Sequence, residues 1–510
     1  MNNLKSNALI KWTGIVTVLL LLSRITGFFR ETAIAYRFGT SAETDAYLIA
    51  AMLPQILFYA FSDAVRTAFI PVYGEYRESE ECNAFALTSY VILGGMLLVF
   101  SVLLVYFAPV VVRLAAPGFT GATYRQTVVM SRILLPGLLF MGLSGLSSGI
   151  LHANKNFIIP ALPAYPSNLL IIFFSYLSGA TFGIEALAWV TLIGFAGQFF
   201  IQVPAVAKLG VFKSRKLLWH HPGLKKMSIL LPPVILGGAA LELKSIVDRV
   251  FASLLPEGSI AALNFAARIY LLPHGILIVA LLSVLYPTMV EMGVEKNITA
   301  LKKTIRHGLG LITLAVFPMM VGLIVLSTPI VRILFERGAF DAAATQSTAF
   351  ALTFYSLGLV AIGAQALLSR AFYALSDTIT PMIVTFFLVI ANAVFNWLLL
   401  KPLQHGGIAL GTSLAFNLGL LVLFCLLRRK IGPFGGREIL ATLWKSALAA
   451  AIMGIFLFFG KGYLVSTGLR LAMELGALIG LGSLVYFFMA WLLKISELKL
   501  AFNVLRKKLK

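Results

Sequence analysis

Residues Ile15 to Tyr36 read IVTVLLLLSRITGFFRETAIAY, an apolar run that nevertheless contains charged residues. A membrane-spanning helix needs about 20 mostly apolar residues, and this run is long enough. Arg24, Arg30 and Glu31 lie well inside it. Ionised groups at membrane depth are costly, and they usually face a protein interior or a water-filled path. The run therefore indicates a membrane protein with a cationic internal chamber.

The whole chain has the composition of a protein that crosses the membrane many times. Of its 510 residues, 59% are hydrophobic and 12% are charged, and the mean hydropathy is +0.93. Soluble domains carry roughly 25% charged residues. We predict an all-α polytopic membrane protein with about fourteen transmembrane helices. The predicted spans are 9–36, 44–73, 84–114, 125–151, 157–180, 185–208, 227–254, 258–290, 304–327, 344–373, 379–400, 407–428, 440–460 and 469–493.

The net charge of +21 is unevenly distributed over the connecting segments. With a cytoplasmic N-terminus, about 25 Lys and Arg fall on one side of the membrane and about 8 on the other, as the positive-inside rule requires. The richest segments are 208–226, 291–306, 428–437 and 494–510. Both termini are therefore predicted to be cytoplasmic. The basic ends are expected to contact anionic membrane lipids rather than nucleic acid.

Three weak internal similarities recur in order at nearly one spacing. The segment RETAIAYRFGTSAETDAYLIAAMLP, ending at Pro54, resembles RVFASLLPEGSIAALNFAARIYLLP, ending at Pro273, at an offset of 219. HANKNFIIP resembles YALSDTITP at an offset of 221, and LGVF resembles IGPF at 222. Internal repeats of this kind are a transporter design, with the substrate site at the repeat interface near the midplane.

The repeat predicts how the chain is organised. Residues 1–215 and 216–435 are expected to form two six-helix lobes in parallel pseudo-repeat. Residues 436–510 add two further helices and a basic cytoplasmic tail. The first helices of each lobe, near 9–73 and 227–290, are expected to line the interface.

Helical geometry groups the polar residues of the first span. At about 100° per residue, Arg24 and Glu31 lie within about 20° of one face, and Ser23 and Arg30 share a neighbouring face. Gly27 lies between both pairs and contributes no side chain. The result is a gap flanked by two guanidinium groups, which suit bidentate binding of phosphate or carboxylate.

Further charged residues lie in or near the spans of both lobes. The alternative to a ligand-facing role is a structural ion pair between or within helices. Asp63 and Arg66, three residues apart, are expected to pair locally, and both roles stay open for Asp248 and Arg249. Arg24, Arg30 and Arg268 are expected to face a ligand, because cations here outnumber nearby carboxylates. The remaining candidates are Asp45 and His274.

A second set of polar residues could bind a cation. Asn392 and Asn396 are four residues apart on one predicted helix, and Thr412 begins the next. With Asp248 they could form an oxygen-rich site for a monovalent ion. The alternative is hydrogen bonding between helices. No cofactor is expected, because the chain contains neither a phosphate-loop pattern nor an H-E-x-x-H pattern.

Six motifs are distributed along the chain, namely SRITGFFRE, FGTSAETDAYLIAAMLP, AFIPVYGEY, DRVFASLLPEGSIAALNFAARIYLLPHGI, LFERGAF and RAFYALSDTITP. Together they resemble the MurJ/MviN family of bacterial flippases for lipid II, the undecaprenyl-diphosphate-linked peptidoglycan precursor. The resemblance covers nearly the whole chain and implies a fold of the multidrug/oligosaccharidyl-lipid/polysaccharide exporter superfamily. The family's final helix pair forms a groove for the lipid tail.

The resemblance also assigns residues by motif. Arg24 and Arg30 match the family's first-helix arginines, and Arg268 matches its essential eighth-helix arginine. Asp45 matches an acidic residue at the start of the second helix, and Glu31 stands where the family often has Asp. The family often places arginines where this chain has Phe58 and Tyr59. That departure leaves a flippase for another undecaprenyl-diphosphate-linked glycan as an alternative.

The resulting hypothesis is a lipid II flippase of the bacterial plasma membrane, acting as a monomer by alternating access. It would serve cell-wall synthesis without ATP, because the membrane potential favours outward movement of an anionic head group by about 2.3 kcal/mol per charge per 100 mV. Coupling to a monovalent cation is a further expectation. A cation-coupled multidrug exporter is disfavoured by the Arg-rich first span. An enzyme acting on the same lipid is disfavoured because loop 328–343 offers only Glu336 and Asp341.

Overall fold

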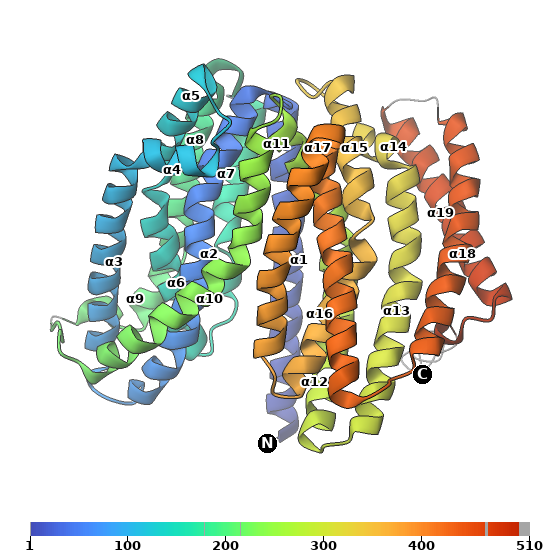
Figure 1. Cartoon of the computed structure of the whole chain (residues 1–510). Coiled ribbons are helices and arrows are strands. Elements are labelled where there is room, and N and C mark those ends of the chain that lie inside the picture. The colour runs from blue at the N-terminus through green and yellow to red at the C-terminus, as the bar shows by residue number, and fades with distance from the viewer. Residues whose placement is uncertain (1, 178, 215, 465–467, 499–510) are drawn as a thin grey trace. The chain divides into compact units, whose positions relative to one another are not determined.

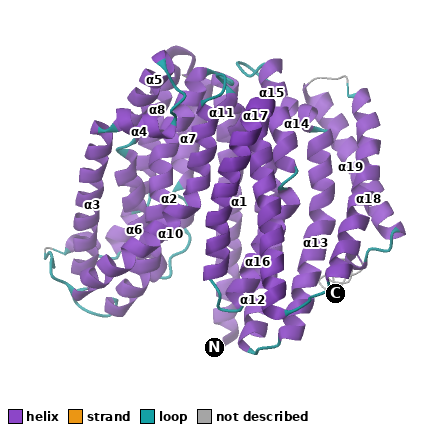
Figure 2. Ribbon diagram, in the orientation of Figure 1, coloured by secondary structure: helices purple, strands orange, loops and turns teal. Residues whose placement is uncertain are grey.

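The computed structural model describes residues 2–177, 179–214, 216–464 and 468–498, and side chains are not described for 2–13, 59–68, 180, 233–241 and 468–469. Within these ranges every regular element is helical (Figure 2). The predicted all-α fold is thus confirmed. The first helices are α1 (Asn2–Phe38), α2 (Ala42–Tyr76), α3 (Cys82–Tyr106), α4 (Ala108–Ala115), α5 (Gly121–Leu134), α6 (Gly137–Ala153), α7 (Ala164–Leu177), α8 (Gly179–Phe200), α9 (Val203–Lys208) and α10 (Pro222–Ser253).

The remaining helices continue the same pattern to the C-terminal region. Short 3-10 turns occur at Ile159–Ala161, Val211–Lys213 and Lys461–Tyr463, and a π turn occurs at His274–Ile278. The later helices are α11 (Ser259–Pro273), α12 (Val279–Val294), α13 (Ile298–Val325), α14 (Ser327–Phe335), α15 (Ala342–Ser356), α16 (Leu359–Ala374), α17 (Ile379–Ile431), α18 (Gly436–Gly460) and α19 (Gly468–Leu492).

Many of these helices are long and apolar enough to cross a membrane. Within the described part of the chain, nine helices pass this test of length and apolar composition, or ten if the bent pair α15 and α16 forms one span. The predicted number of about fourteen is larger, partly because α17 contains two predicted spans, 379–400 and 407–428. Its backbone breaks between them at Gln404, where φ is 48°. The chain is therefore a multi-pass membrane protein.

The repeat predicted from sequence reappears in the backbone dihedral angles. Residues with positive φ, which only a few positions adopt, recur in the two halves at offsets of 219 to 222. The order of helices also repeats, because α3 is followed by the short α4 as α13 is followed by the short α14. Helix α8 breaks at Gly183, where φ is 71°, as α17 breaks at Gln404. The recurring pairs are Gly39 and Gly258, Lys155 and Ser376, Gly183 and Gln404, and Gly210 and Gly432.

One of these repeated turns carries a charged contact outside the spans. Ser376 has φ 59° and is followed by Asp377, whose carboxylate accepts hydrogen bonds from Thr380 N (2.9 Å) and Thr380 Oγ1 (2.8 Å). The Lys430 ammonium also donates to Asp377 Oδ2. The hydrogen bond from Lys430, and next those from Thr380, hold the pKa of Asp377 at about 2. This turn is thus tied to the end of α17.

The chain packs as two compact units. One comprises Met1–Ala261 and Arg337–Phe340, and the other comprises Ala262–Glu336 and Asp341–Lys510. Helix α10 packs along α2 (Figure 1), so the packing boundary lies after Ala261. The lobe boundary predicted from the sequence repeat, between residues 215 and 216, differs from this packing boundary. It describes where the repeat begins again, and it stays a prediction.

The first unit has a core built around α2, α3 and α6. Phe69 and Phe85 are fully buried, with their rings stacked 5.9 Å apart. His221, just before α10, stacks on Phe85 at 4.7 Å and closes this core at the loop end. Gly149 allows α6 to approach α2, because a Cβ there would lie 3.3 Å from Phe69 Cδ1. Aromatic packing and close helix approach therefore fix the position of α2.

The second unit is organised around α13. Helices α18 and α19 pack on it (Figure 1), and the fully buried Tyr486 of α19 donates to Leu314 O at 2.7 Å. The buried carboxylate of Glu497 accepts from Thr442 Oγ1 (3.0 Å) and Ser496 Oγ (2.9 Å). The predicted final helix pair is thus an integral part of this unit.

Candidate functional site

The charged part of α1 packs against α7 in the first unit. Gly27 faces that helix, since a Cβ there would lie 3.7 Å from Asn168 Nδ2. Asn168 is 4% exposed, and its amide donates to Thr26 Oγ1 at 3.2 Å and to Ser23 O at 3.5 Å. The glycine predicted to open a gap on α1 therefore provides room for a buried amide from another helix.

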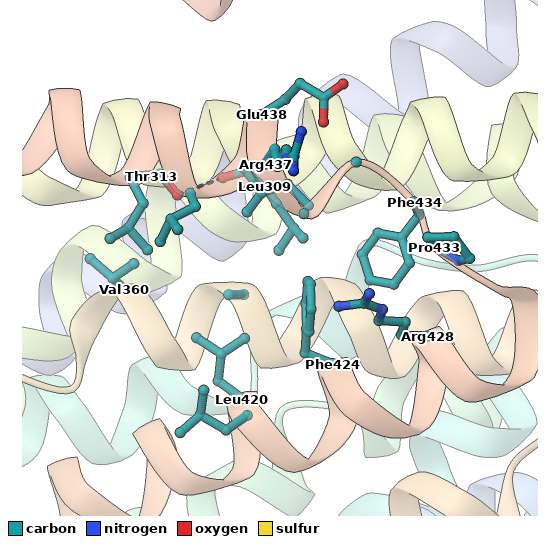
Figure 3. Close-up of a pocket in the computed structure, with 17 residues that line it drawn as sticks. Leu309, Thr313, Val360, Leu420, Phe424, Arg428, Pro433, Phe434, Arg437 and Glu438 are labelled. Carbon is teal, nitrogen blue, oxygen red and sulfur yellow. Dashed lines mark hydrogen bonds between the residues drawn. The ribbon is translucent and has the colours of Figure 1, made fainter.

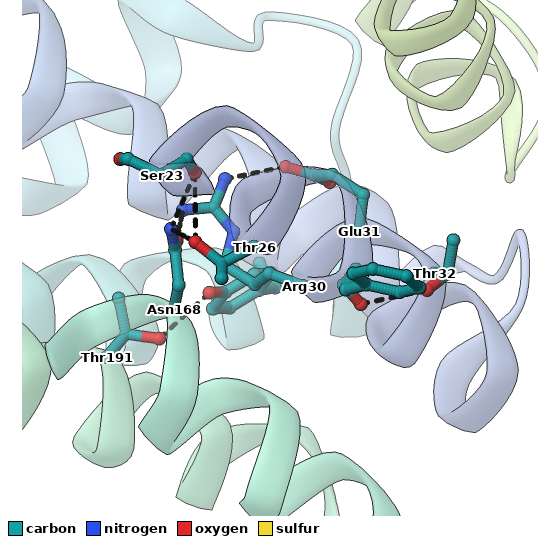
Figure 4. Close-up of polar contacts among 9 residues, drawn as sticks. Ser23, Thr26, Arg30, Glu31, Thr32, Asn168 and Thr191 are labelled. Atoms are coloured by element: carbon teal, nitrogen blue, oxygen red, sulfur yellow. Dashed lines mark hydrogen bonds and ion pairs between the residues drawn. The ribbon is translucent and has the colours of Figure 1, made fainter. Parts of the chain in front are cut away.

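Arg30 lies at the centre of this cluster (Figure 4). Its Nη1 donates to Asn168 Oδ1 at 3.2 Å and its Nη2 to Glu31 Oε1 at 2.6 Å. The side chain of Glu31 is 3% exposed and that of Arg30 is 22% exposed. A charge-assisted bond of this length orients the guanidinium and offsets the cost of burying the carboxylate. Arg30 is thus held in place with one part still accessible.

The structure brings together most of the residues predicted on α1. Ser23, Gly27 and Arg30 lie against Asn168, and Glu31 pairs with Arg30. Arg24 is exposed on the same helix. This difference in exposure gives the two arginines different settings. Arg30 is oriented by Glu31 and Asn168, and the side chain of Arg24 is exposed.

Asp45 lies near the start of α2 and is 2% exposed. Its Oδ2 accepts from Gly258 N and its Oδ1 from Ala261 N, both at 2.7 Å. These amides belong to the start of α11, where helix N–H groups have no intrahelical partner. A carboxylate there satisfies both donors and complements the helix dipole. The observed contacts of Asp45 are therefore structural.

Glycines allow three segments to meet beside Asp45, in an arrangement that we call the clasp. A Cβ on Gly258 would lie 2.4 Å from Thr40 O, and one on Gly39 would lie 2.3 Å from Ala339 O. Ala339 N donates to Tyr36 O at 2.8 Å. The clasp consists of Tyr36–Asp45, Gly258–Ala261 and Arg337–Phe340. The last segment connects α14 to α15 along the chain but packs in the first unit.

Gly338→Ala is expected to lower the midpoint of thermal unfolding, because a Cβ there would lie 2.3 Å from Tyr36 O and φ is +60°. Strain of this kind costs on the order of 1–3 kcal/mol. Gly74→Ala is the matched control, since no heavy atom lies within 4 Å of its Cβ position and alanine favours a helix. Equal midpoints for the two purified variants would contradict a close-packed clasp.

The remaining predicted residues belong to both units. Arg249 Nη1 donates to Ile260 O at 3.2 Å, and Asp248 forms an ion pair with Lys244 at 2.9 Å, both within the first unit. In the second unit Arg268 is exposed on α11, and His274 is half-buried where the π turn begins. The side chains of Asp63 and Arg66 lie outside the described residues.

The polar residues of α17 form hydrogen bonds in the second unit. Asn392 Nδ2 donates to Thr412 Oγ1 at 3.4 Å, and Asn396 Nδ2 donates to Asn392 Oδ1 at 3.4 Å. Both asparagines are fully buried and Thr412 is 1% exposed. The bond from Asn392 to Thr412 connects the two segments of α17 across its break at Gln404, and the bond from Asn396 to Asn392 lies within the first segment. They agree with the interhelical role, while the cation site with Asp248 stays a prediction.

Two polar contacts of this site were missed from sequence. Asn168 is a polar residue in the apolar run of α7. The sequence shows this polar position but does not indicate which residues its side chain contacts. Tyr47 of α2 and Thr191 of α8 form a buried hydrogen bond of 2.9 Å. Such contacts join helices far apart in sequence, so they need the fold to be found.

Comparison with known proteins places this architecture in a family. A family model described as "Lipid II flippase MurJ" matches residues 34–475. A probable lipid II flippase MurJ of Rickettsia prowazekii is 31% identical over 495 residues, covering 94% of this chain and 97% of that protein. One of Buchnera aphidicola is 33% identical over 452 residues, covering 87% and 88%.

Solved structures agree with the sequence comparisons. A lipid II flippase MurJ in an inward closed conformation matches with a TM-score of 0.79 and 28% identity, covering 93% of this chain and 97% of that one. An inward-facing multidrug resistance MATE family transporter of the MOP superfamily matches with a TM-score of 0.67, covering 81% and 98%, but at 15% identity it shares the fold alone. This chain belongs to the lipid II flippase MurJ family.

Proposed function

We propose that this chain flips lipid II from the inner to the outer leaflet of the bacterial plasma membrane, for peptidoglycan synthesis. The match to the family over residues 34–475 carries this proposal. The chain also covers 97% of a relative that is named as a probable lipid II flippase. The family is one of transporters, so this chain is a transporter rather than an enzyme.

The arginines give the proposal its chemistry. Arg30 is oriented by Glu31 and Asn168, and Arg24 and Arg268 are exposed on α1 and α11. Guanidinium groups bind phosphate oxygens through two parallel hydrogen bonds, so they suit the diphosphate of a polyprenyl-linked precursor. In this proposal the polyprenyl tail stays in the bilayer, near residues 440–493.

Transport would follow alternating access, with both termini in the cytoplasm and the protein acting as a monomer. The clasp would then close the outer end of the pathway, because α1 runs outward from the N-terminus to Tyr36. The membrane potential would drive the anionic head group outward by about 2.3 kcal/mol per charge per 100 mV. A monovalent cation at Asp248, Asn392, Asn396 and Thr412 is a secondary proposal for coupling.

The direct experiment is complementation. Cells depleted of their lipid II flippase are expected to regain growth and shape when they express this chain. A flippase for another undecaprenyl-diphosphate-linked glycan would be produced in the membrane without restoring growth. That alternative rests on Phe58 and Tyr59, where the family often has arginines. Failure of rescue at normal protein levels would therefore refute lipid II as the substrate.

A further inference from the structure

A cavity of about 680 Å³ lies in the second unit, between α13, α16, α17 and the start of α18 (Figure 3). Its volume falls within the range of about 300–1,000 Å³ typical of small-ligand sites. Most of the lining is aliphatic or aromatic. The apolar side chains that matter here are Leu309, Val360, Leu420, Phe424, Leu440 and Leu443.

Basic groups lie at one end of this cavity. Arg428 lies near the C-terminal end of α17, and Arg437 lies near the start of α18. Both side chains line the cavity and are exposed. Neither forms an ion pair or hydrogen bond through its side chain with another described residue. Arg306 of α13 pairs with Glu438 at 3.3 Å. The three guanidinium groups and one carboxylate leave this end with a net positive charge.

The cavity opens to an apolar surface rather than to a polar one. Leu421 and Leu440, which also line it, are 62% and 65% exposed. Exposed leucines on a multi-pass membrane protein face lipid, since burial in hydrocarbon is favourable for them. An occupant must therefore combine a long apolar part with an anionic head group.

We infer that this cavity binds an anionic glycerophospholipid, with one acyl chain among the apolar side chains and the phosphate at Arg428 and Arg437. The basic segment 428–437 is predicted to be cytoplasmic, and the cytoplasmic leaflet is rich in anionic lipids. Basic pockets between helices on that side recognise such head groups. An undecaprenyl chain is far longer than an acyl chain and fits a cavity of this volume less well. This inference does not depend on which glycan the protein transports.

The test is lipid binding to the purified full-length protein. Native mass spectrometry would compare dioleoyl phosphatidylglycerol with the zwitterionic phosphatidylcholine of the same chains. Arg428→Gln with Arg437→Gln is expected to weaken phosphatidylglycerol binding by about tenfold or more, because each charge-assisted contact is lost. The matched control is Arg429→Gln with Lys216→Gln, which removes the same charge from exposed residues that do not line the cavity.

A second variant tests the apolar part of the cavity without changing charge. Figure 3 shows Val360 at the cavity wall, so Val360→Trp would fill the acyl-chain space. Loss of phosphatidylglycerol binding in this variant and in the double arginine variant, but not in the control, supports the inference. Unchanged binding in both would overturn it. So would displacement of phosphatidylglycerol from the unmodified protein by equimolar undecaprenyl diphosphate, since the occupant would then be the substrate.

Discussion

Arg24→Ala and Arg268→Ala are each expected to abolish rescue of cells that are depleted of their lipid II flippase. Both side chains are exposed, so neither change opens a packed core. Each removes a guanidinium that can hold the diphosphate through paired hydrogen bonds, and a bond to a charged group contributes about 1.5–3 kcal/mol. Loss of one such contact weakens head-group binding by about tenfold or more. The measurement is growth after depletion, with immunoblotting to confirm normal protein levels.

The control for this experiment is Arg77→Ala. Arg77 is exposed and follows the last turn of α2, so its removal takes away one positive charge outside the proposed chamber. We expect full rescue from this variant. If Arg24→Ala and Arg268→Ala also rescue growth fully, the proposal that the arginines bind the head group is wrong. Rescue by the control alone excludes a general effect of charge on membrane insertion.

Much of the fold could be predicted because hydropathy and repetition report on long elements. The predicted gap between 400 and 407 contains the break of α17 at Gln404. The helices α4 and α14 were not predicted as separate elements, since α4 was included in the span 84–114 and α14 fell in a loop. They have 8 and 9 residues, and each carries an arginine in its last turn. Helices this short give no signal in a test that requires about 20 apolar residues.

The candidate site could be predicted only along α1. Helical periodicity grouped Arg24 with Glu31 and Ser23 with Arg30, on either side of Gly27. The structure places Ser23, Gly27 and Arg30 at one point and pairs Glu31 with Arg30, while Arg24 is exposed. Helical periodicity could not identify Asn168 as a contact of Arg30, because the two residues are 138 positions apart along the chain. Asp45 was predicted as a substrate-binding residue from its charge and from the resemblance to the family. Its two backbone bonds to the start of α11 depend on a turn that only the folded chain forms.

A covalent link across the clasp is expected to stop transport reversibly. If the clasp closes the outer end of the pathway, it must separate each time the head group is released. Tyr36 O and Ala339 N are 2.8 Å apart, so cysteines at these two positions lie within reach of a short bis-methanethiosulfonate reagent. Cys82 and Cys425 are free thiols and would first be replaced by alanine. Flipping, followed as lipid II reaching an impermeant probe outside the cell, should fall to background after cross-linking.

Reversal of the cross-link distinguishes a block of clasp opening from damage to the protein. Reduction with dithiothreitol should restore flipping, because it cuts the link and leaves both cysteines in place. The two single variants, Tyr36→Cys and Ala339→Cys, carry the same reagent at one end only and should keep their activity. Full flipping by the cross-linked protein would mean that the clasp stays closed throughout transport. Its glycines and Asp45 would then serve only to hold the ends of α1, α2 and α11 together, and the outer opening would have to lie elsewhere.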